Sequence, residues 1–194
     1  MLDLPAEIHD NKTLSPPHGV VLKEIAIRPA TAADFGAMWT IFQELIATGD
    51  TYYFAADTSR DDCHAYWFGP GIESFVAELN GDRLLGMYRL TANQRDRGAH
   101  VANASFMVGP AAQGVGVGAM LGRDCLARAH RQGYLAMQFN YVVSSNVAAV
   151  LLWKKLGFSI IGTLPRAYHH RYLGYVDVYV MYQLLADPSH WPDA

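Results

Sequence analysis

The sequence predicts a single α/β (α+β) domain with a mixed central β-sheet of about seven strands flanked by helices. Strand-like and helix-like segments follow one another in the order β-α-α-β-β-β-α-β-α-β-β. The chain is 51% hydrophobic and 17% charged, which is typical of a globular protein, and 194 residues fit one domain. We assign the domain to residues 23–186, with an N-terminal arm at 1–22 and a C-terminal tail at 187–194.

The first half of the domain has two helices between its first two strands. Alternating apolar residues predict a strand at 24–28, and Thr31 can cap the next helix. The apolar stripe of that helix recurs at helical spacing, in Phe35, Met38, Trp39, Phe42, Leu45 and Ile46. A shorter helix is expected at 60–67. Strands at 73–79 and 84–91 flank an Asn-Gly-Asp hairpin turn.

The second half of the domain alternates strands with helices. A strand at 101–108 precedes a glycine-rich turn, and the long helix that follows spans about 115–131. A strand at 135–142 leads into a helix at about 146–156, which ends before a glycine. The remaining elements are a strand at 158–164, a loop rich in Tyr and His at 165–175, and a last strand at 176–184.

The glycine-rich turn reads Val108-Gly-Pro-Ala-Ala-Gln113-Gly114-Val-Gly116-Val-Gly118. Glycines let a ligand approach the backbone closely, and the N–H groups at a helix N-terminus favour a phosphate. The turn therefore predicts a phosphate site. A dinucleotide-binding fold does not fit, because it needs G-x-G-x-x-G and an acidic residue about 20 positions later. A P-loop does not fit either, because no Gly-Lys-Ser/Thr is present.

Composition excludes several other classes of function. The net charge of −3 and the lack of a basic run argue against nucleic acid as a partner. No apolar stretch is long enough to span a membrane, and the N-terminus has no signal-peptide pattern, so we expect a cytoplasmic protein. Cys63 and Cys125 form no metal or redox motif, and Cys125 falls on an apolar helix face. Adjacent His169 and His170 would point to opposite faces of a strand, so we expect no metal.

Two motifs together resemble the GNAT superfamily of N-acetyltransferases. The first is Val108-x-Pro110 with Gln113-x-x-Gly116-x-Gly118, and the second is Asn146-x-x-Ala149-x-x-Leu152-Trp153-x-Lys155-Leu156-Gly157-Phe158. The resemblance implies the GNAT fold, acetyl-CoA as co-substrate, and a Val108 N–H that polarises the thioester carbonyl. The residues that it implies for coenzyme A binding are Met107, Val108, Gln113, Gly114, Val115, Gly116, Val117, Gly118, Asn146 and Trp153.

The chain departs from the superfamily at the positions of the general acid and the general base. Trp153 stands where many members have a tyrosine general acid, which leaves Tyr141, Tyr168 or Tyr172 as substitutes. The strand at 101–108 has no carboxylate for a general base, and Glu78 on an earlier strand is the only nearby candidate.

Asparagines inside strands are the other unusual feature. Asn103 and Asn140 stand in apolar strands, where a buried amide needs partners. Together with Asn146, they give the chain a narrower resemblance to acetyltransferases of proline analogues such as azetidine-2-carboxylate. In that group strand asparagines bind the substrate. With the superfamily resemblance, this leads us to assign catalysis to Asn103, Asn140 and Val108, and acceptor binding to Asn103, Asn140, Tyr53 and Tyr168. Each asparagine also has a purely structural interpretation, as an internal hydrogen-bonding group or, for Asn146, as a helix N-cap.

The combined interpretation is an acetyl-CoA-dependent N-acetyltransferase of a small amine, either an amino acid, an imino acid or a toxic analogue. Arg166 or Arg171 could receive a substrate carboxylate. Two alternatives stay open, a protein or peptide N-acetyltransferase and a non-catalytic acyl-CoA-binding module. Members of the superfamily often dimerise, so a homodimer is compatible with the resemblance.

Overall fold

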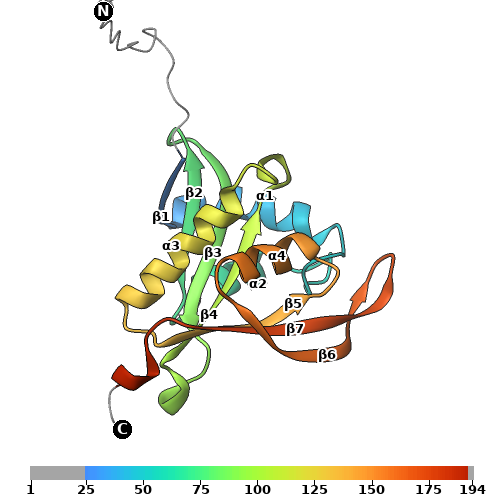
Figure 1. Ribbon diagram of the computed structural model, residues 1–194. Coiled ribbons are helices and arrows are strands. Elements are labelled where there is room, and N and C mark those ends of the chain that lie inside the picture. Colours follow the sequence, from blue (N-terminus) through green and yellow to red (C-terminus); the bar gives the residue numbers. More distant parts are fainter. Residues whose placement is uncertain (1–24, 192–194) are drawn as a thin grey trace, which may run out of the picture.

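A computed structural model describes residues 25–191. Its core is one seven-stranded sheet in the order β1-β2-β3-β4-β5-β7-β6, in which only β4 and β5 run parallel (Figure 1). The predicted mixed sheet of about seven strands is thus confirmed. The expected arm at 1–22 and the last three residues of the expected tail lie outside the described residues.

The helices and strands follow the predicted order. The strands are β1 (Ile25–Pro29), β2 (Glu73–Leu79), β3 (Arg83–Ala92), β4 (Val101–Val108), β5 (Ala136–Val143), β6 (Ser159–His170) and β7 (Gly174–Leu184). The α-helices are α1 (Phe35–Ile46), α2 (Arg60–Phe68), α3 (Val117–Arg131) and α4 (Val147–Lys155). The apolar stripe expected for α1 packs into the core, with Leu45 and Ile46 buried and Phe35 and Trp39 partly buried. Within it, Met38 and Phe42 are fully buried.

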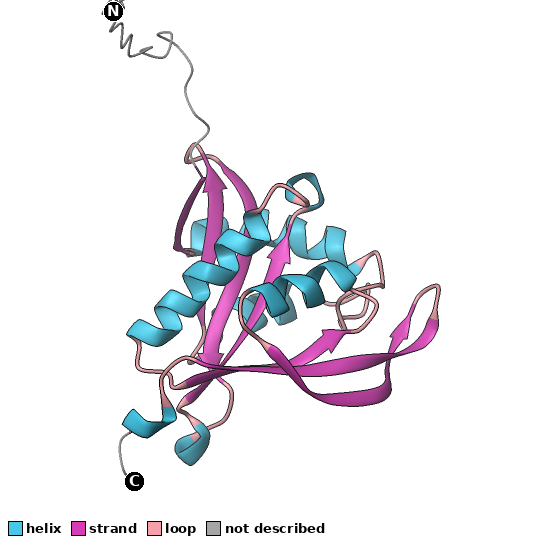
Figure 2. Cartoon of the chain, in the orientation of Figure 1, coloured by secondary structure: helices cyan, strands magenta, loops and turns pink. Residues whose placement is uncertain are grey.

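Helices cover both faces of the sheet (Figure 2). α3 and α4 pack on one face, where Leu121, Cys125 and Trp153 join a core with side chains of β2 to β5. α1 and α2 pack on the other face, around Trp67 and Met107. Alternation along a strand sends successive side chains to opposite faces. Each side chain of β4 therefore faces one of the two helix layers, α3 and α4 on one side or α1 and α2 on the other.

The two parallel strands separate soon after they begin to pair. β4 and β5 pair only at Val101 with Ala136 and at Ala102 with Met137. A bulge follows in β5, where the pairing with β7 shifts register between Phe139 and Val142. Bulges bend the strand that carries them. The rest of β4 and β5 therefore leaves an inter-strand gap, bounded by residues 103–108 and 138–143.

The segment 165–175, expected as a loop, is mostly strand, so that expectation is wrong. β6 and β7 form a long hairpin that projects from the sheet (Figure 1). The cause is a register shift between Leu164 and Tyr168, at which Arg166 adopts a φ of 52°. Pairing resumes at Tyr168 and the chain turns only at residues 171–173, just before Gly174, whose φ is 71°. Pro165 interrupts the ladder without ending the strand.

Candidate active site

The edge of β4 offers unpaired backbone groups to the inter-strand gap. The N–H of Gly109 donates to the carbonyl of Leu85, and the N–H of Asn93 donates to the carbonyl of Val101. In an antiparallel pair the bonded residues alternate, so every second residue between these points turns its backbone away from β3. Val108 is one of those residues, because Gly86 opposes it in the register. Its N–H therefore faces the gap, beyond the last residue that β5 pairs.

The other residues of this edge are Ala104 and Phe106, by the same alternation. The Phe106 carbonyl accepts a hydrogen bond from the Tyr52 hydroxyl. The side-chain amide of Gln113 donates to the Val108 carbonyl at 3.5 Å. Met107 belongs to the other set of residues in this alternation, whose backbone groups face β3. Its backbone faces Met87 and its side chain is 1% exposed, so it offers no group to the gap.

The glycine-rich turn lies between the end of β4 and the start of α3. Gly114 and Gly116 have φ values of 76° and 90°, and an added Cβ at either would meet nothing within 4 Å. Gly116 is the N-cap of α3, so the first N–H groups of the helix, from Val117 onward, have no intrahelical acceptor. Gly118 faces α4 instead of open space, since a Cβ there would be in ordinary contact, at 3.4 Å, with a methyl group of Leu152. The turn presents an open cradle of N–H groups at a helix N-terminus.

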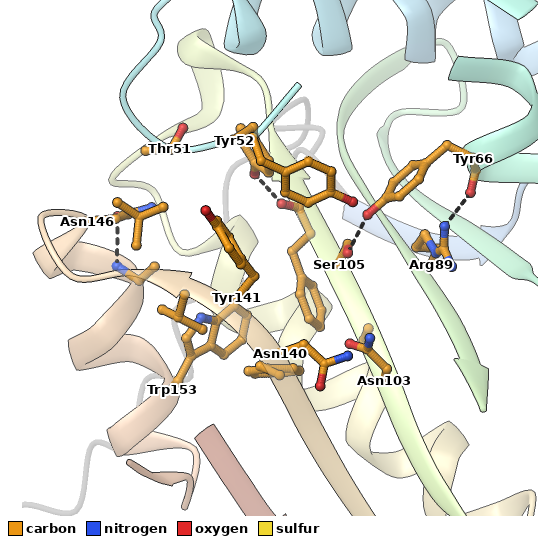
Figure 3. Close-up of a pocket in the computed structure, with 17 residues that line it drawn as sticks. Thr51, Tyr52, Tyr66, Arg89, Asn103, Ser105, Asn140, Tyr141, Asn146 and Trp153 are labelled. Carbon is orange, nitrogen blue, oxygen red and sulfur yellow. Dashed lines mark hydrogen bonds between the residues drawn. The ribbon is translucent and has the colours of Figure 1, made fainter. Parts of the chain in front are cut away.

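A cavity of about 240 Å³ occupies the inter-strand gap. We call it the central cavity; Figure 3 shows its lining. Both strands contribute, as does the segment after α1. The lining residues used below are Tyr52, Tyr53, Tyr66, Arg89, Asn103, Ser105, Phe106, Asn140, Tyr141, Asn146 and Trp153. No Asp or Glu lines it within residues 25–191.

The three asparagines singled out in the sequence all line this cavity (Figure 3). Asn103 is half-buried, and its amide has no hydrogen-bond partner among residues 25–191. Asn140 lies at the β5 bulge, where its amide donates to Asn93 and accepts from Gln138, both at 2.7 Å. Asn146 caps α4, and its Oδ1 accepts from the Ala149 N–H at 3.1 Å. Asn103 thus offers a free amide, whereas the other two are partly engaged.

A polar cluster that the sequence analysis missed lies on the cavity wall toward α2. The Tyr66 hydroxyl donates to Ser105 Oγ at 2.6 Å, and Arg89 donates to the Tyr66 carbonyl at 2.7 Å. Arg89 opposes Ser105 across the β3–β4 pair, so both share a face with Asn103. An arginine inside an otherwise apolar strand was the available sequence signal. Its location depends on a pairing that the sequence does not show.

Aromatic side chains form the outer wall of the cavity. Tyr53 packs edge-on against Tyr141 at 5.6 Å between ring centroids, and its ring also contacts Phe54. Phe54 itself packs on Phe42 of α1, so it belongs to the core. Tyr53 is 56% exposed and lines the cavity, as expected of a residue in an acceptor wall. Burial raises the pKa of both Tyr52 and Tyr141, which makes each a weaker acid.

The remaining proton-transfer candidates lie in other places. Tyr168 is 6% exposed, and its hydroxyl donates to the Tyr52 carbonyl at 3.2 Å outside the central cavity. Tyr172 is 76% exposed near the tip of the β6–β7 hairpin. Glu78 is held by Arg28, with 2.7 Å between Nη2 and Oε2, and does not line the cavity.

Trp153 lines the cavity as an apolar wall. It is 7% exposed and packs against Phe106 and Phe139 with ring centroids 4.7 and 4.8 Å apart. The indole therefore shapes the cavity by packing. In the part of the chain that the structure describes, no three His, Cys, Asp or Glu side chains gather to hold a metal ion. No helix in that part is long and apolar enough to cross a membrane.

Comparison with known proteins shows which family and which solved structures this chain is similar to. A family model described as "Acetyltransferase (GNAT) family" matches residues 38–158. The solved GCN5-related N-acetyltransferase from Kribbella flavida is 40% identical, with a TM-score of 0.79 over 82% of this chain and 97% of that one.

Two curated proteins are also similar. The L-amino acid N-acetyltransferase AaaT of Escherichia coli is 28% identical over 82% of this chain and 98% of its own length. The N-acetyltransferase aca1 of Schizosaccharomyces pombe is 33% identical over 50% of this chain, and the match spans 47% of its length.

Proposed function

The chain belongs to the GNAT family of acetyl-CoA-dependent N-acetyltransferases, and we propose that its acceptor is the amine of a small amino acid, imino acid or related analogue. The structural observation that carries this acceptor class is the central cavity. It is small, bordered by aromatic rings and lined in part by neutral amides, and it lies beside the unpaired edge of β4.

The residues present fit acetyl-CoA. The cradle at Gly114 and Gly116 leaves space against the backbone and directs free N–H groups of α3 toward an anion, which suits the pyrophosphate. The unpaired edge of β4 suits the pantetheine amides, which would bind like an added strand. Val108 belongs to that edge and Val117 to the helix start, so one continuous stretch of backbone serves both parts of the ligand.

The chemistry needs a neutral amine and a polarised thioester. The amine nitrogen forms a bond to the carbonyl carbon, the carbon–sulfur bond breaks, and the proton lost by the amine balances the thiolate. In this proposal the Val108 N–H donates to the carbonyl oxygen as negative charge develops there. Burial raises the pKa values of Tyr52 and Tyr141, and their hydroxyls already donate to the carbonyls of Phe106 and Ala167, so in this proposal the thiolate takes its proton from solvent.

Asn103 is the proposed acceptor-binding group. Its amide is the free one, and it lies on β4 on the same face as Ser105. An amide oxygen can orient an amine for attack without adding charge. The E. coli relative is named as an acetyltransferase of L-amino acids, which supports the same acceptor class here. Beyond the hydrogen bonds that they already make, Asn140 retains one side-chain N–H donor for a ligand and Asn146 retains two.

The test is release of coenzyme A thiol from acetyl-CoA with a panel of acceptors, followed by mass spectrometry of the products. The panel contains free amino acids, proline analogues, polyamines and short peptides. We expect N-acetylated amino or imino acids. Asn103→Ala should lower acceptor turnover and leave coenzyme A affinity unchanged, while Gln132→Ala, a surface amide, should change neither. Products formed only from peptides, or binding of acetyl-CoA without transfer, would refute the proposed acceptor class.

A further inference from the structure

Arg89 is the only formally charged residue that lines the central cavity in the described chain. It lies on β3 opposite Ser105, and its side chain is half-buried. The guanidinium stacks on the Tyr66 ring, with its carbon 4.2 Å from the ring centroid, and donates through Nη1 to the Tyr66 carbonyl. These two contacts fix the plane of the guanidinium.

The charge of Arg89 has no protein counter-ion within residues 25–191. The other cations with comparable burial are paired, Arg28 with Asp34 and Arg128 with Asp124. Arg89 makes one hydrogen bond, so most of its five N–H donors have no partner in the same range. A partly buried charge without a partner is costly, unless a ligand or water compensates it.

The neighbours of Arg89 match a ligand that carries an anion and an amine. The Tyr66 hydroxyl is already used, because it donates to Ser105 Oγ at 2.6 Å. Arg89 is therefore the strongest free hydrogen-bond donor on the cavity wall toward α2. Asn103 lies two residues before Ser105 on the same face. The cation and the free amide thus lie on the face that carries α2, whereas the glycine cradle opens at α3 on the opposite face.

We propose that Arg89 binds the carboxylate of the acceptor and so makes the enzyme specific for amino and imino acids over uncharged amines. This inference rests on the proposed function, because it concerns the acceptor of the same reaction. A planar guanidinium can donate two parallel hydrogen bonds to a carboxylate. The arginines named from the sequence do not serve this role. Arg166 contacts the Tyr175 ring on the hairpin, and Arg171 donates to the Ala47 carbonyl, both outside the central cavity.

The experiment compares each acceptor with its carboxamide, which keeps the amine and removes the negative charge. L-proline with L-prolinamide and L-methionine with L-methioninamide are suitable pairs. The enzymes are the wild type, Arg89→Gln, Arg89→Lys and the control Arg171→Gln. Thermal unfolding and coenzyme A affinity are measured for each variant, so that a folding defect is recognised.

We expect Arg89→Gln to lower kcat/KM for the amino acid by about 10- to 100-fold, mainly through KM, because a hydrogen bond to a charged group is lost. Turnover of the carboxamide should change by less than about threefold, since it does not use the charge. Arg89→Lys should restore part of the preference, and Arg171→Gln should keep all of it.

Two results would overturn the assignment of Arg89. One is an equal loss for the acid and the carboxamide in Arg89→Gln, which would make the residue structural. The other is a wild type that acetylates amines or peptides and shows no preference for a carboxylate. Absence of N-acetylation of every acceptor would instead contradict the proposed function itself.

Discussion

Substitution of Gly116 by glutamate tests the phosphate cradle with a clear expected magnitude. An added Cβ meets nothing within 4 Å, so Gly116→Glu introduces no steric clash. Its φ of 90° imposes a backbone cost of about 1–2 kcal/mol on folding. The new carboxylate would lie at the N-terminus of α3, where it would occupy the N–H groups and repel a bound pyrophosphate.

The size of that repulsion follows from Coulomb's law. Two unit charges about 6 Å apart, at the effective dielectric constant of about 20 that applies near a protein surface, repel by about 3 kcal/mol. This is roughly a 100-fold loss of affinity for coenzyme A. Titration calorimetry with coenzyme A measures it directly. Pantetheine, which has no pyrophosphate, should bind the variant as well as it binds the wild type.

Gly133→Glu is the matched control. Gly133 also has open space and a φ of 84°, but it follows the other end of α3. The control should lose at least as much stability in thermal unfolding, because a carboxylate is unfavourable near a helix C-terminus, and it should keep its affinity for coenzyme A. If Gly116→Glu bound coenzyme A as tightly as Gly133→Glu does, the cradle would not be the phosphate site.

Three further predictions follow from the same structure. Gly86→Ala should lower kcat by about 10- to 100-fold. The new Cβ would lie 2.8 Å from the Met107 carbonyl and 3.2 Å from Val108 Cα, so the backbone of β4 must move and displace the Val108 N–H. Unchanged kcat in steady-state kinetics would argue against that donor. Among residues 25–191 no carboxylate lines the cavity, so log kcat/KM should rise with pH until the acceptor ammonium itself is titrated. A plateau near pH 6–7 that is common to acceptors of different basicity would reveal an enzyme base instead. The Arg28 guanidinium lowers the pKa of Asp34 well below its usual range, so their pairing stabilises the fold fully above about pH 4, weakens below that value, and is lost only as pH falls through the lowered pKa of the folded state. Asp34→Asn should therefore cost about 1–2 kcal/mol in urea unfolding at pH 7 and less at pH 3, and equal costs at both would disagree.

Local sequence patterns predicted most of the fold. Helical spacing of apolar residues identified α1, and the glycine-rich turn marked the start of α3 to within two residues. Cys125 is fully buried, as its position on an apolar helix face predicted. These features depend on residues that are close to one another in the sequence, within one or two helical turns, so a single sequence is enough to predict them.

Features that depend on pairing between distant segments were harder to predict. The loop expected at 165–175 became a hairpin because β6 resumes its ladder with β7 after the bulge at Arg166. Asn140 was expected to offer its amide, but the β5 bulge brings it to Asn93 from the end of β3. Arg89 was missed because only the β3–β4 register brings it beside Ser105 and the cavity. Long-range pairing decided each of these positions.

The central claim is that acetyl-CoA binds along the β4 edge and the glycine-rich turn, with its thioester at Val108. Titration of ¹⁵N-labelled protein with acetyl-CoA, followed by amide chemical shifts, tests it most directly. The account predicts the largest shifts at Val108 and at residues 114–118, and only small ones at the surface hollow lined by Thr40, Glu44 and Arg83. Shifts that gather in that hollow and spare Val108 would contradict the proposed site.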